Sequence, residues 1–367
     1  MFPEKPRRWL KPWLTCSNWT RRSRETESAV RSELGPVALI RLLSRKSNLA
    51  LIQAREVQAA IRNVDPSVQV EIVTVTSAGE RAPDRRIEEF DTTGVFTKAL
   101  EEALIEGAGD AAVHSAKDLP TILEDRFEIA AYLRRGDRRD ALVIRSDQDN
   151  GKGHRSLDSR WEGYEEGQGG FLESALSVGA LVATGSVRRR AQLSKLRPDL
   201  TFMDLRGNME RRLESLRKCD GVVAGACALD RLGISEGGRS HLKILRLHEE
   251  VVVPAAGQGA IAVESLRGDT FADLWAGISD KMTAVEVAAE RFFLRGLRAG
   301  CTAPVGVTAH LLEDNTVSIT SVVCSRDGHR SLKVRYRLGS VEEAVKGGDE
   351  LASEASEIWA TDACLPE

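Results

Sequence analysis

The sequence predicts an α/β fold in which two domains built on mixed sheets are followed by a smaller α+β domain. Strand-length apolar segments alternate with helix-length segments in two separate runs, at about 37–138 and 139–255. Alternation of this kind is typical of a parallel or mixed sheet with helices on both faces. In the last portion, three strands follow one another between two helices, which is typical of an α+β domain.

The overall composition narrows the class of protein. Of the 367 residues, 42% are hydrophobic and 29% are charged, as in globular proteins of two or three domains. The formal net charge of -3 leaves no basic surplus for a nucleic-acid surface. The longest uncharged stretches, at about 174–187 and 251–263, are shorter than the roughly 18 apolar residues of a membrane span. We therefore expect neither nucleic acid nor a membrane as a partner.

The six cysteines are scattered, with no CxxC pair and no matching histidine spacing. This pattern favours neither a zinc site nor a disulfide framework, and it indicates a reducing, cytoplasmic compartment. Residues 1–36 mix tryptophan, arginine and glutamate, and we expect a disordered N-terminal extension there. An organelle transit peptide is the alternative.

Hydrophobic periodicity places the individual elements. In the first run we expect strands at 37–43, 68–75 and 111–114, helices at 49–61 and 96–105, and a mobile loop at 77–93. In the second we expect strands at 141–144, 181–184, 201–205 and 221–226, helices from Val187 and Met209, and a surface insertion at 147–170. The last portion is expected to contain helices at 284–298 and 341–359 and strands at 305–312, 316–324 and 331–338.

Two strand–turn–helix segments of the second run carry cations where the helix begins. In the first, Thr184 and Ser186 precede Arg188, Arg189 and Arg190. Backbone N–H groups at a helix N-terminus favour an anion, and cations there oppose the helix dipole unless an anion joins them. A carboxylate or phosphate site is the preferred interpretation, and a solvated basic turn is the alternative.

The second segment presents Arg206, Asn208 and Arg212 at the same edge of the sheet. Arg212 lies one helical turn after Asn208 and therefore on the same face. Guanidinium groups bind carboxylates in a bidentate manner, so the two turns together predict a ligand with several carboxylates.

A buried strand at 111–114 runs directly into Lys117 and Asp118. A carboxylate on such a turn can accept hydrogen bonds from a cationic or N–H-rich group, or act as a general acid or base. A structural turn aspartate paired with Lys117 is an equal alternative. His114 is expected to pack within the strand.

Three further segments carry polar or reactive groups. Arg45 adds another cation at the start of the first helix. Cys301 follows a helix end at Gly300, and the arginines just before it favour the nucleophilic thiolate, although composition alone favours a buried, inert thiol. The stretch 254–263 contains glycines but matches no phosphate-binding motif, so we expect a hinge or crossover strand.

Eight segments resemble the hydroxymethylbilane synthase (porphobilinogen deaminase) family, in the family's order and spacing. They are RKSNLALIQA, TGVFTKALEEAL, AAVHSAKDLPT, RRDALV, GSVRRRAQL, LRGNMERRL, VVPAAGQGAIAVE and ERFFLRGLRAGCTAPVGV. The resemblance implies two domains similar to the halves of type II periplasmic binding proteins, with two crossovers between them and the site in their cleft. The domains would span 37–138 with 256–278, 139–255, and 279–367.

The resemblance also implies a transferase, typically monomeric, that condenses four porphobilinogen molecules into the linear tetrapyrrole hydroxymethylbilane with loss of ammonia. Its dipyrromethane cofactor would be held by a thioether to Cys301, with no metal. Asp118 would hydrogen-bond pyrrole N–H groups and stabilise the azafulvene cation that remains when ammonia leaves. The groups implied to hold the cofactor are Lys117, Ser47, Thr184, Ser186, Arg188 and Arg189, and those implied to hold substrate are Arg45, Gln53, Lys98, Arg206, Asn208 and Arg212.

Three positions depart from the family's pattern. Gly185 stands where a serine is usual, Thr93 lies in a loop that is commonly basic, and Asp230 replaces a basic residue. These departures bear on rate and loop closure more than on reaction class. Two other functions stay open: a non-catalytic small-anion-binding protein, and an inactive homologue that loads the cofactor without elongating it.

Overall fold

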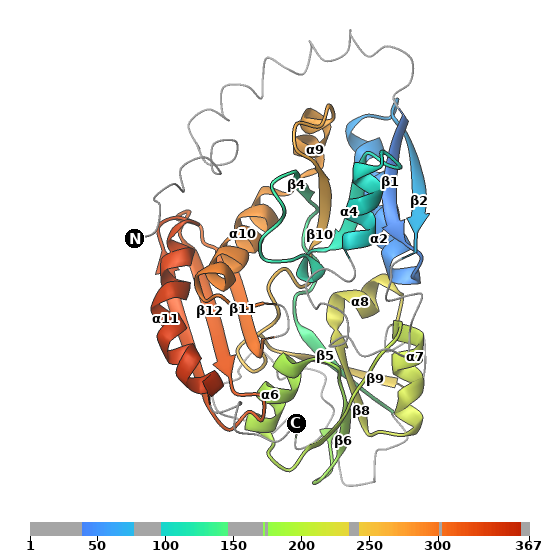
Figure 1. Cartoon of the computed structure of the whole chain (residues 1–367). Coiled ribbons are helices and arrows are strands. Elements are labelled where there is room, and N and C mark those ends of the chain that lie inside the picture. The colour runs from blue at the N-terminus through green and yellow to red at the C-terminus, as the bar shows by residue number, and fades with distance from the viewer. Residues whose placement is uncertain are drawn as a thin grey trace.

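The computed structural model describes residues 39–76, 97–145, 172, 175–234, 242–300 and 303–360. They form three domains, each built on its own sheet (Figure 1). Two five-stranded mixed sheets and one three-stranded antiparallel sheet confirm the expected fold class. No helix within the described ranges is long and apolar enough to cross a membrane.

The first domain has strand order β2-β1-β3-β10-β4, in which β10 runs antiparallel to both neighbours. Helix α2 covers the sheet with a buried face at Gln53, Val57 and Ile61, which are spaced one helical turn apart. Trp275 of α9 packs into the same core. The elements are β1 (Leu39–Arg45), α2 (Asn48–Val64), β2 (Gln69–Val75), α4 (Lys98–Ile105), β3 (Ala111–Ser115), β4 (Phe127–Tyr132), β10 (Ile261–Leu266) and α9 (Ala272–Ile278).

The second domain repeats this plan with strand order β7-β6-β8-β5-β9. Strand β6 is parallel to β7 and β8, whereas β5 is antiparallel to β8 and β9. The elements are β5 (Asp140–Arg145), β6 (Leu181–Ala183), α6 (Val187–Leu196), β7 (Thr201–Met203), α7 (Met209–Glu214), β8 (Gly221–Gly225), α8 (Ala226–Arg231) and β9 (Leu242–Leu247).

The third domain is an antiparallel meander with two helices packed on it, and it lies beside the other two (Figure 1). Phe293 of α10 is fully buried in its core and stacks at a tilt on Tyr336. The elements are α10 (Lys281–Gly296), β11 (Val305–Leu311), β12 (Val317–Cys324), β13 (Ser331–Leu338) and α11 (Glu343–Ala360).

Two crossovers join the first and second domains, one between β4 and β5 and the other between β9 and β10. They contact each other through the N–H of Gly136, which donates to the carbonyl of Gly259 over 3.2 Å. A Cβ atom at Gly136 would lie 2.4 Å from the sulfur of Cys227, so only glycine fits at this approach. The crossovers are therefore tightly packed against each other and against α8.

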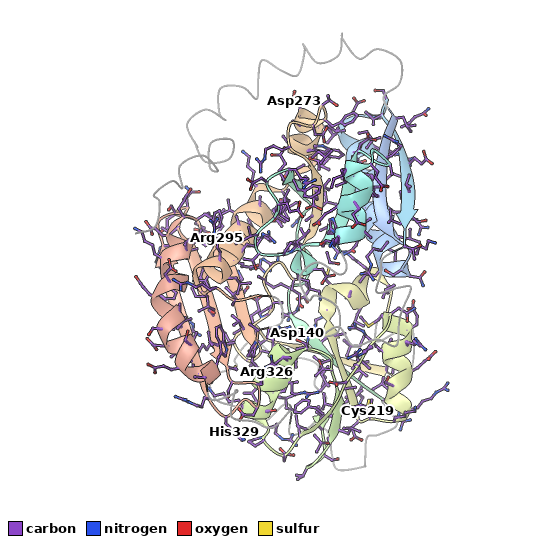
Figure 2. The ribbon with its side chains drawn as sticks, in the orientation of Figure 1. Asp140, Cys219, Asp273, Arg295, Arg326 and His329 are labelled. Carbon is purple, nitrogen blue, oxygen red and sulfur yellow. The ribbon has the colours of Figure 1, made fainter. Side chains whose placement is uncertain are left out.

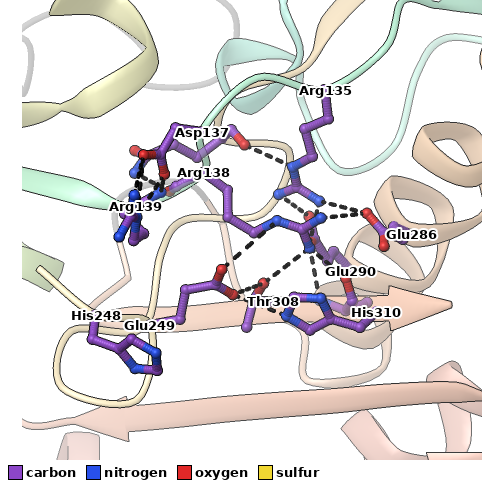
Figure 3. Close-up of polar contacts among 12 residues, drawn as sticks. Arg135, Asp137, Arg138, Arg139, His248, Glu249, Glu286, Glu290, Thr308 and His310 are labelled. Atoms are coloured by element: carbon purple, nitrogen blue, oxygen red, sulfur yellow. Dashed lines mark hydrogen bonds and ion pairs between the residues drawn. The ribbon is translucent and has the colours of Figure 1, made fainter. Parts of the chain in front are cut away.

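The third domain is tied to both crossovers through the fully buried carboxylate of Glu290 (Figure 3). Arg135 of the first crossover donates two hydrogen bonds to it, at 2.8 and 3.1 Å. The N–H of Gly257 in the second crossover donates at 2.7 Å, and that of Ala309 in β11 donates at 2.9 Å. One carboxylate thus fixes three segments that lie far apart in the sequence.

The sequence-based elements are largely recovered, with five differences. Strands β4 and β9 and helices α8 and α9 were not expected, and the strand expected at 201–205 ends at Met203. The stretch expected to be a hinge or crossover strand contains the second crossover and leads into β10. The N-terminal extension, the loop at 77–93 and the insertion at 147–170 lie outside the described residues, and the domain boundaries stay a prediction.

We predict that Glu290→Ala destabilises the protein by about 3–5 kcal/mol, because it leaves two backbone N–H groups buried without an acceptor and leaves the buried Arg135 charge with only the more distant Glu286 carboxylate, at 3.7 Å. Urea denaturation followed by circular dichroism measures the change. The matched control is Glu124→Ala, whose ion pair with Arg126 is exposed and is worth about 0–1 kcal/mol. Equal effects of the two substitutions would contradict the role assigned to Glu290.

Candidate functional site

The turn after β3 presents the first candidate residues. Strand β3 is buried from Ala111 to His114, and a short 3-10 helix over Ala116–Asp118 follows it. The buried side chain of Leu119 anchors the end of this turn, so the Asp118 carboxylate is exposed while Lys117 is half-buried. The geometry therefore directs a carboxylate away from the sheet edge.

Asp118 borders an open cavity of about 70 Å³ between the start of α2 and the end of β3. Ser47 begins α2, and its hydroxyl accepts a hydrogen bond from the N–H of Ala50. The buried Gln53 donates to the hydroxyl of Ser115 over 2.9 Å and so joins α2 to β3. The cavity is lined by Arg45, Ser47, Leu49, Ala50, Gln53, Thr97, Val113, His114, Ser115 and Asp118.

In the second domain, the turn between β6 and α6 is held by its own hydroxyl groups. The Thr184 hydroxyl accepts from the N–H of Ser186, and the Ser186 hydroxyl caps α6 by accepting from the N–H of Arg189. Gly185 lies between them, and a Cβ atom there would come within 2.5 Å of the Leu205 carbonyl oxygen. In this chain the turn is therefore packed for glycine, not for the serine usual in the family.

The two arginines after this turn are buried against Asp140, which is fully buried near the centre of the molecule (Figure 2). Arg188 donates to Asp140 and to the Val253 carbonyl, at 2.7 and 2.8 Å. Arg189 donates to the other Asp140 oxygen at 2.9 Å and to the Val223 carbonyl at 3.0 Å. Although desolvation opposes it, attraction by both guanidinium groups holds the pKa of Asp140 well below its ordinary range.

Sequence reasoning missed Asp140, because its partners lie 48 and 49 residues away along the chain. It also assigned both arginines to ligand carboxylates. Arg188 donates to an internal carboxylate and an internal carbonyl, whereas the second terminal nitrogen of Arg189 also reaches Gln258, at 3.5 Å. Their roles in binding stay predictions.

The turn between β7 and α7 supplies three more of the predicted residues. Asn208 caps α7 by accepting from the N–H of Arg211, and Arg206 is exposed. Arg212 donates to the Gly207 carbonyl over 2.9 Å. Burial and repulsion by Arg189 lower the pKa of Arg212, while attraction by Asp118 opposes them. The Arg212 guanidinium of the second domain is therefore attracted electrostatically by the Asp118 carboxylate of the first domain.

Lys117 also lies where the two domains meet. Its amine donates to the side-chain oxygen of Gln258, at 3.4 Å. Burial, aided by repulsion from Arg189, lowers the pKa of Lys117 to about 8 even though Asp118 and Asp140 oppose the shift. The structure thus brings Asp118, Lys117, Arg189 and Arg212 to one interdomain region.

Other predicted residues lie apart from this region or outside the description. Lys98 is exposed at the start of α4 and does not line the cavity. His114 is buried and contacts Glu264 at 3.0 Å, as expected of a packed strand residue. Cys301 and Thr93 lie outside the described residues. Asp230, one of the departures, forms an ion pair with Arg246 at 2.6 Å.

The donor set suits a ligand with several carboxylates. It offers ammonium, guanidinium, hydroxyl and amide groups, which bind carboxylates. Within the described part of the chain, no group of three histidine, cysteine, aspartate or glutamate side chains could hold a metal ion. A dipyrromethane with acidic side chains fits such a region, because its carboxylates match the cations and its pyrrole N–H groups match Asp118.

Comparison with known proteins agrees with this chemistry. Two family models match the chain: "Porphobilinogen deaminase, dipyromethane cofactor binding domain" over residues 40–273, and "Porphobilinogen deaminase, C-terminal domain" over residues 284–357. The porphobilinogen deaminase of Sulfurimonas denitrificans is 33% identical, with 85% of this chain and 92% of that protein covered. The proteins of the same name from Roseiflexus sp. and Thermus thermophilus are 38% and 37% identical, covering 85% and 86% of this chain and 93% and 94% of their own.

Among solved structures, the effector-binding domain of BenM with benzoate aligns with a TM-score of 0.37 and 14% identity. It covers 66% of this chain and 91% of the BenM domain.

The depressed pKa of Asp140 predicts how stability changes with pH. The folded protein binds this proton less readily than the unfolded chain, so the contribution of Asp140 is complete above its ordinary pKa of about 3.9 and is lost as the pH falls below it. Asp140→Asn is expected to lower the melting temperature at pH 7, and its difference from wild type is expected to shrink between about pH 4 and pH 2.

Thermal melts at a series of pH values measure this difference. Asp204→Asn is the matched control, because Asp204 is largely exposed and pairs with Arg190 at the surface. A difference between wild type and Asp140→Asn that stays constant down to pH 2 would contradict the buried ion-pair assignment.

Proposed function

The chain belongs to the porphobilinogen deaminase family, and from this premise we propose that Asp118 is its catalytic carboxylate. The protein is a hydroxymethylbilane synthase, a transferase of porphyrin and heme biosynthesis that uses a dipyrromethane cofactor. It joins four porphobilinogen molecules head to tail, releases ammonia and yields the linear tetrapyrrole hydroxymethylbilane. Family membership over most of the chain supports this function over a non-catalytic binding protein.

One observation carries the proposal for Asp118. Its exposed carboxylate lies at the edge of the cavity, and it interacts electrostatically with one cation from each domain, Lys117 and Arg212. Lys117 is its neighbour in sequence, and Arg212 lies in the second domain. A single carboxylate among cations can meet a substrate that carries both carboxylates and an N–H-bearing ring.

The surrounding cations and hydroxyl groups are proposed to hold the acetate and propionate side chains. Neutral hydroxyl and amide side chains of both domains are proposed to add further hydrogen bonds to these carboxylates. The groups that we propose for the cofactor are Lys117, Ser47, Thr184, Ser186, Arg188 and Arg189, and those for substrate are Arg45, Gln53, Lys98, Arg206, Asn208 and Arg212. Arg188 contributes chiefly by fixing Asp140, since it donates to Asp140 and to the Val253 carbonyl.

The reaction needs a negative group at the substrate ring. When ammonia leaves porphobilinogen, positive charge spreads over the pyrrole, and the Asp118 carboxylate stabilises it through the ring N–H. The attacking α-carbon must then lose its proton, which Asp118 is placed to accept. When bound, the dipyrromethane group supplies the first such α-carbon. Arg212 meanwhile orients the substrate by its carboxylates, and Lys117 does the same for the cofactor.

We propose Cys301 as the point of cofactor attachment. Three described cysteines are unsuited, because Cys219, Cys227 and Cys324 are buried and their burial raises the thiol pKa, to about 12 for Cys324. A reactive thiol needs thiolate character and access to its partner. Cys301 instead follows two arginines, which favour the thiolate.

We further propose that the protein works as a monomer in the cytoplasm. The unpaired state of the three described cysteines supports a reducing compartment. The near-neutral net charge of -3 is consistent with a small-molecule substrate as its partner and with neither nucleic acid nor a membrane in that role.

Asp118→Asn tests the catalytic assignment. It preserves the shape of the side chain but removes its negative charge, so kcat is expected to fall by about 10²–10⁴-fold while KM changes little. Porphobilinogen consumption and tetrapyrrole formation measure the effect. Asp125→Asn is the control, since Asp125 is exposed a few residues further along the chain. A kcat for Asp118→Asn within threefold of wild type would sink the assignment.

A further inference from the structure

Gln258 of the second crossover lies where all three domains meet. Its side chain is 2% exposed although it is polar. A buried amide requires hydrogen-bond partners, since an unsatisfied one costs free energy. Its partners come from the first and second domains and from the crossovers. The sequence alone predicted a hinge or crossover strand for this stretch.

The backbone around Gln258 is held in place on both sides. Gly257 and Gly259 have φ angles of +70° and +91°, which non-glycine residues rarely adopt. The Gly257 N–H donates to Glu290 over 2.7 Å, and the Gln258 carbonyl accepts from the Arg135 guanidinium over 2.8 Å. The point from which the side chain starts is therefore fixed by the same ion pair that anchors the third domain.

The orientation of the amide follows from its partners. Its nitrogen donates to the Arg138 carbonyl at 2.8 Å and to the Asp140 carboxylate at 2.9 Å. Both partners are acceptors, so the amide nitrogen must face them and the amide oxygen must point the other way. That oxygen meets the Lys117 amine at 3.4 Å and the Arg189 guanidinium at 3.5 Å.

A neutral amide suits this position better than a charged or apolar side chain. A carboxylate here would face Asp140, and an apolar group would remove the acceptor of the Lys117 amine, whereas Arg189 would keep Asp140 and the Val223 carbonyl. A Cβ atom at Gly225 would lie 3.6 Å from the Gln258 amide oxygen and 3.7 Å from the Lys117 nitrogen, which are ordinary contact distances. The amide oxygen of Gln258 therefore faces two cations, Lys117 and Arg189, while its nitrogen donates to Arg138 and Asp140.

We propose that Gln258 is a positioning residue, whose amide oxygen holds the Lys117 amine in its charged form. This inference rests on the proposed function, in which Lys117 binds a carboxylate. Gln258 acts through Lys117 and does not touch the reacting atoms.

This role of Gln258 can be measured through the pKa of the Lys117 amine. Burial and repulsion by Arg189 and Arg188 lower the pKa of Lys117 to about 8, against the attraction of Asp118 and Asp140. A hydrogen bond from the charged ammonium to an acceptor raises the pKa of an amine. Without the amide oxygen, the pKa of Lys117 is expected to fall by about one unit, so that much of the amine is neutral at pH 7.5.

The variant is Gln258→Met, which keeps the length of the side chain and removes both polar atoms. Competitive acetylation over a pH series, read by mass spectrometry of the peptide that contains Lys117, gives the pKa of its amine. Exposed Lys218 serves as the internal reference. The matched control is Gln192→Met, which removes another buried amide, one that bonds to the backbone of Val253.

The expected result is a Lys117 pKa about one unit lower in Gln258→Met and unchanged in Gln192→Met. In steady state, Gln258→Met is expected to raise KM about tenfold at pH 8 with kcat within threefold, and to recover part of the KM at pH 6.5. Gln258→Asn, which keeps the amide on a shorter chain, is expected to fall between wild type and Gln258→Met in both measurements.

A Lys117 pKa in Gln258→Met that matches wild type would overturn the proposal, as would an equal shift in Gln192→Met. Failure of the proposed function shows itself differently. Acetylation reports the amine whether or not the protein turns over substrate, whereas failure of the function would appear as no consumption of porphobilinogen by the wild-type protein.

Discussion

The structure depends on one buried carboxylate, Asp140, at the point where the first crossover becomes the second domain's sheet. It neutralises two adjacent guanidinium groups, those of Arg188 and Arg189, whose mutual repulsion in a region of low dielectric would otherwise be large. Removing one partner of such a group is costly, because it leaves charge buried without compensation. Asp140 therefore fixes the start of α6, and with it the turn that carries Thr184 and Ser186.

A second buried carboxylate, Glu290, connects the third domain to the two crossovers. It binds Arg135 and the N–H of Gly257, one in each crossover, and so sets the backbone on either side of Gln258. Gln258 in turn bonds to Asp140 and Lys117. The connections are continuous from α10 to the turn that bears Asp118. The helix that precedes Cys301 and the proposed catalytic carboxylate are thus linked through buried polar contacts.

The sequence predicted the parts of the site that depend on local chemistry. Ser186 and Asn208 cap α6 and α7, because serine and asparagine side chains satisfy the free N–H groups of a helix that starts beside them. Asp118 follows a strand that the run of small apolar residues identified. The family resemblance supplied the reaction and the cofactor, which composition and periodicity alone could not.

The rest required the fold. Asp140 meets its arginines across 48 and 49 residues, and Gln258 meets Lys117 across 141, so no local pattern reports either contact. Strand β9 was overlooked because Lys243 and Arg246 are three residues apart, so its apolar residues do not follow the strict alternation of a half-buried strand. The fit of Gly185 against the Leu205 carbonyl likewise depends on the pairing of β6 with β7.

The central claim is that this polycarboxylate-binding cleft works on a dipyrromethane group attached to Cys301. The intact mass of the purified protein, with Cys301→Ala measured alongside, tests it most directly. The account predicts that wild type carries the added mass of a dipyrrole and that the variant does not. A wild-type protein whose mass remains that of the bare chain after incubation with porphobilinogen would contradict it.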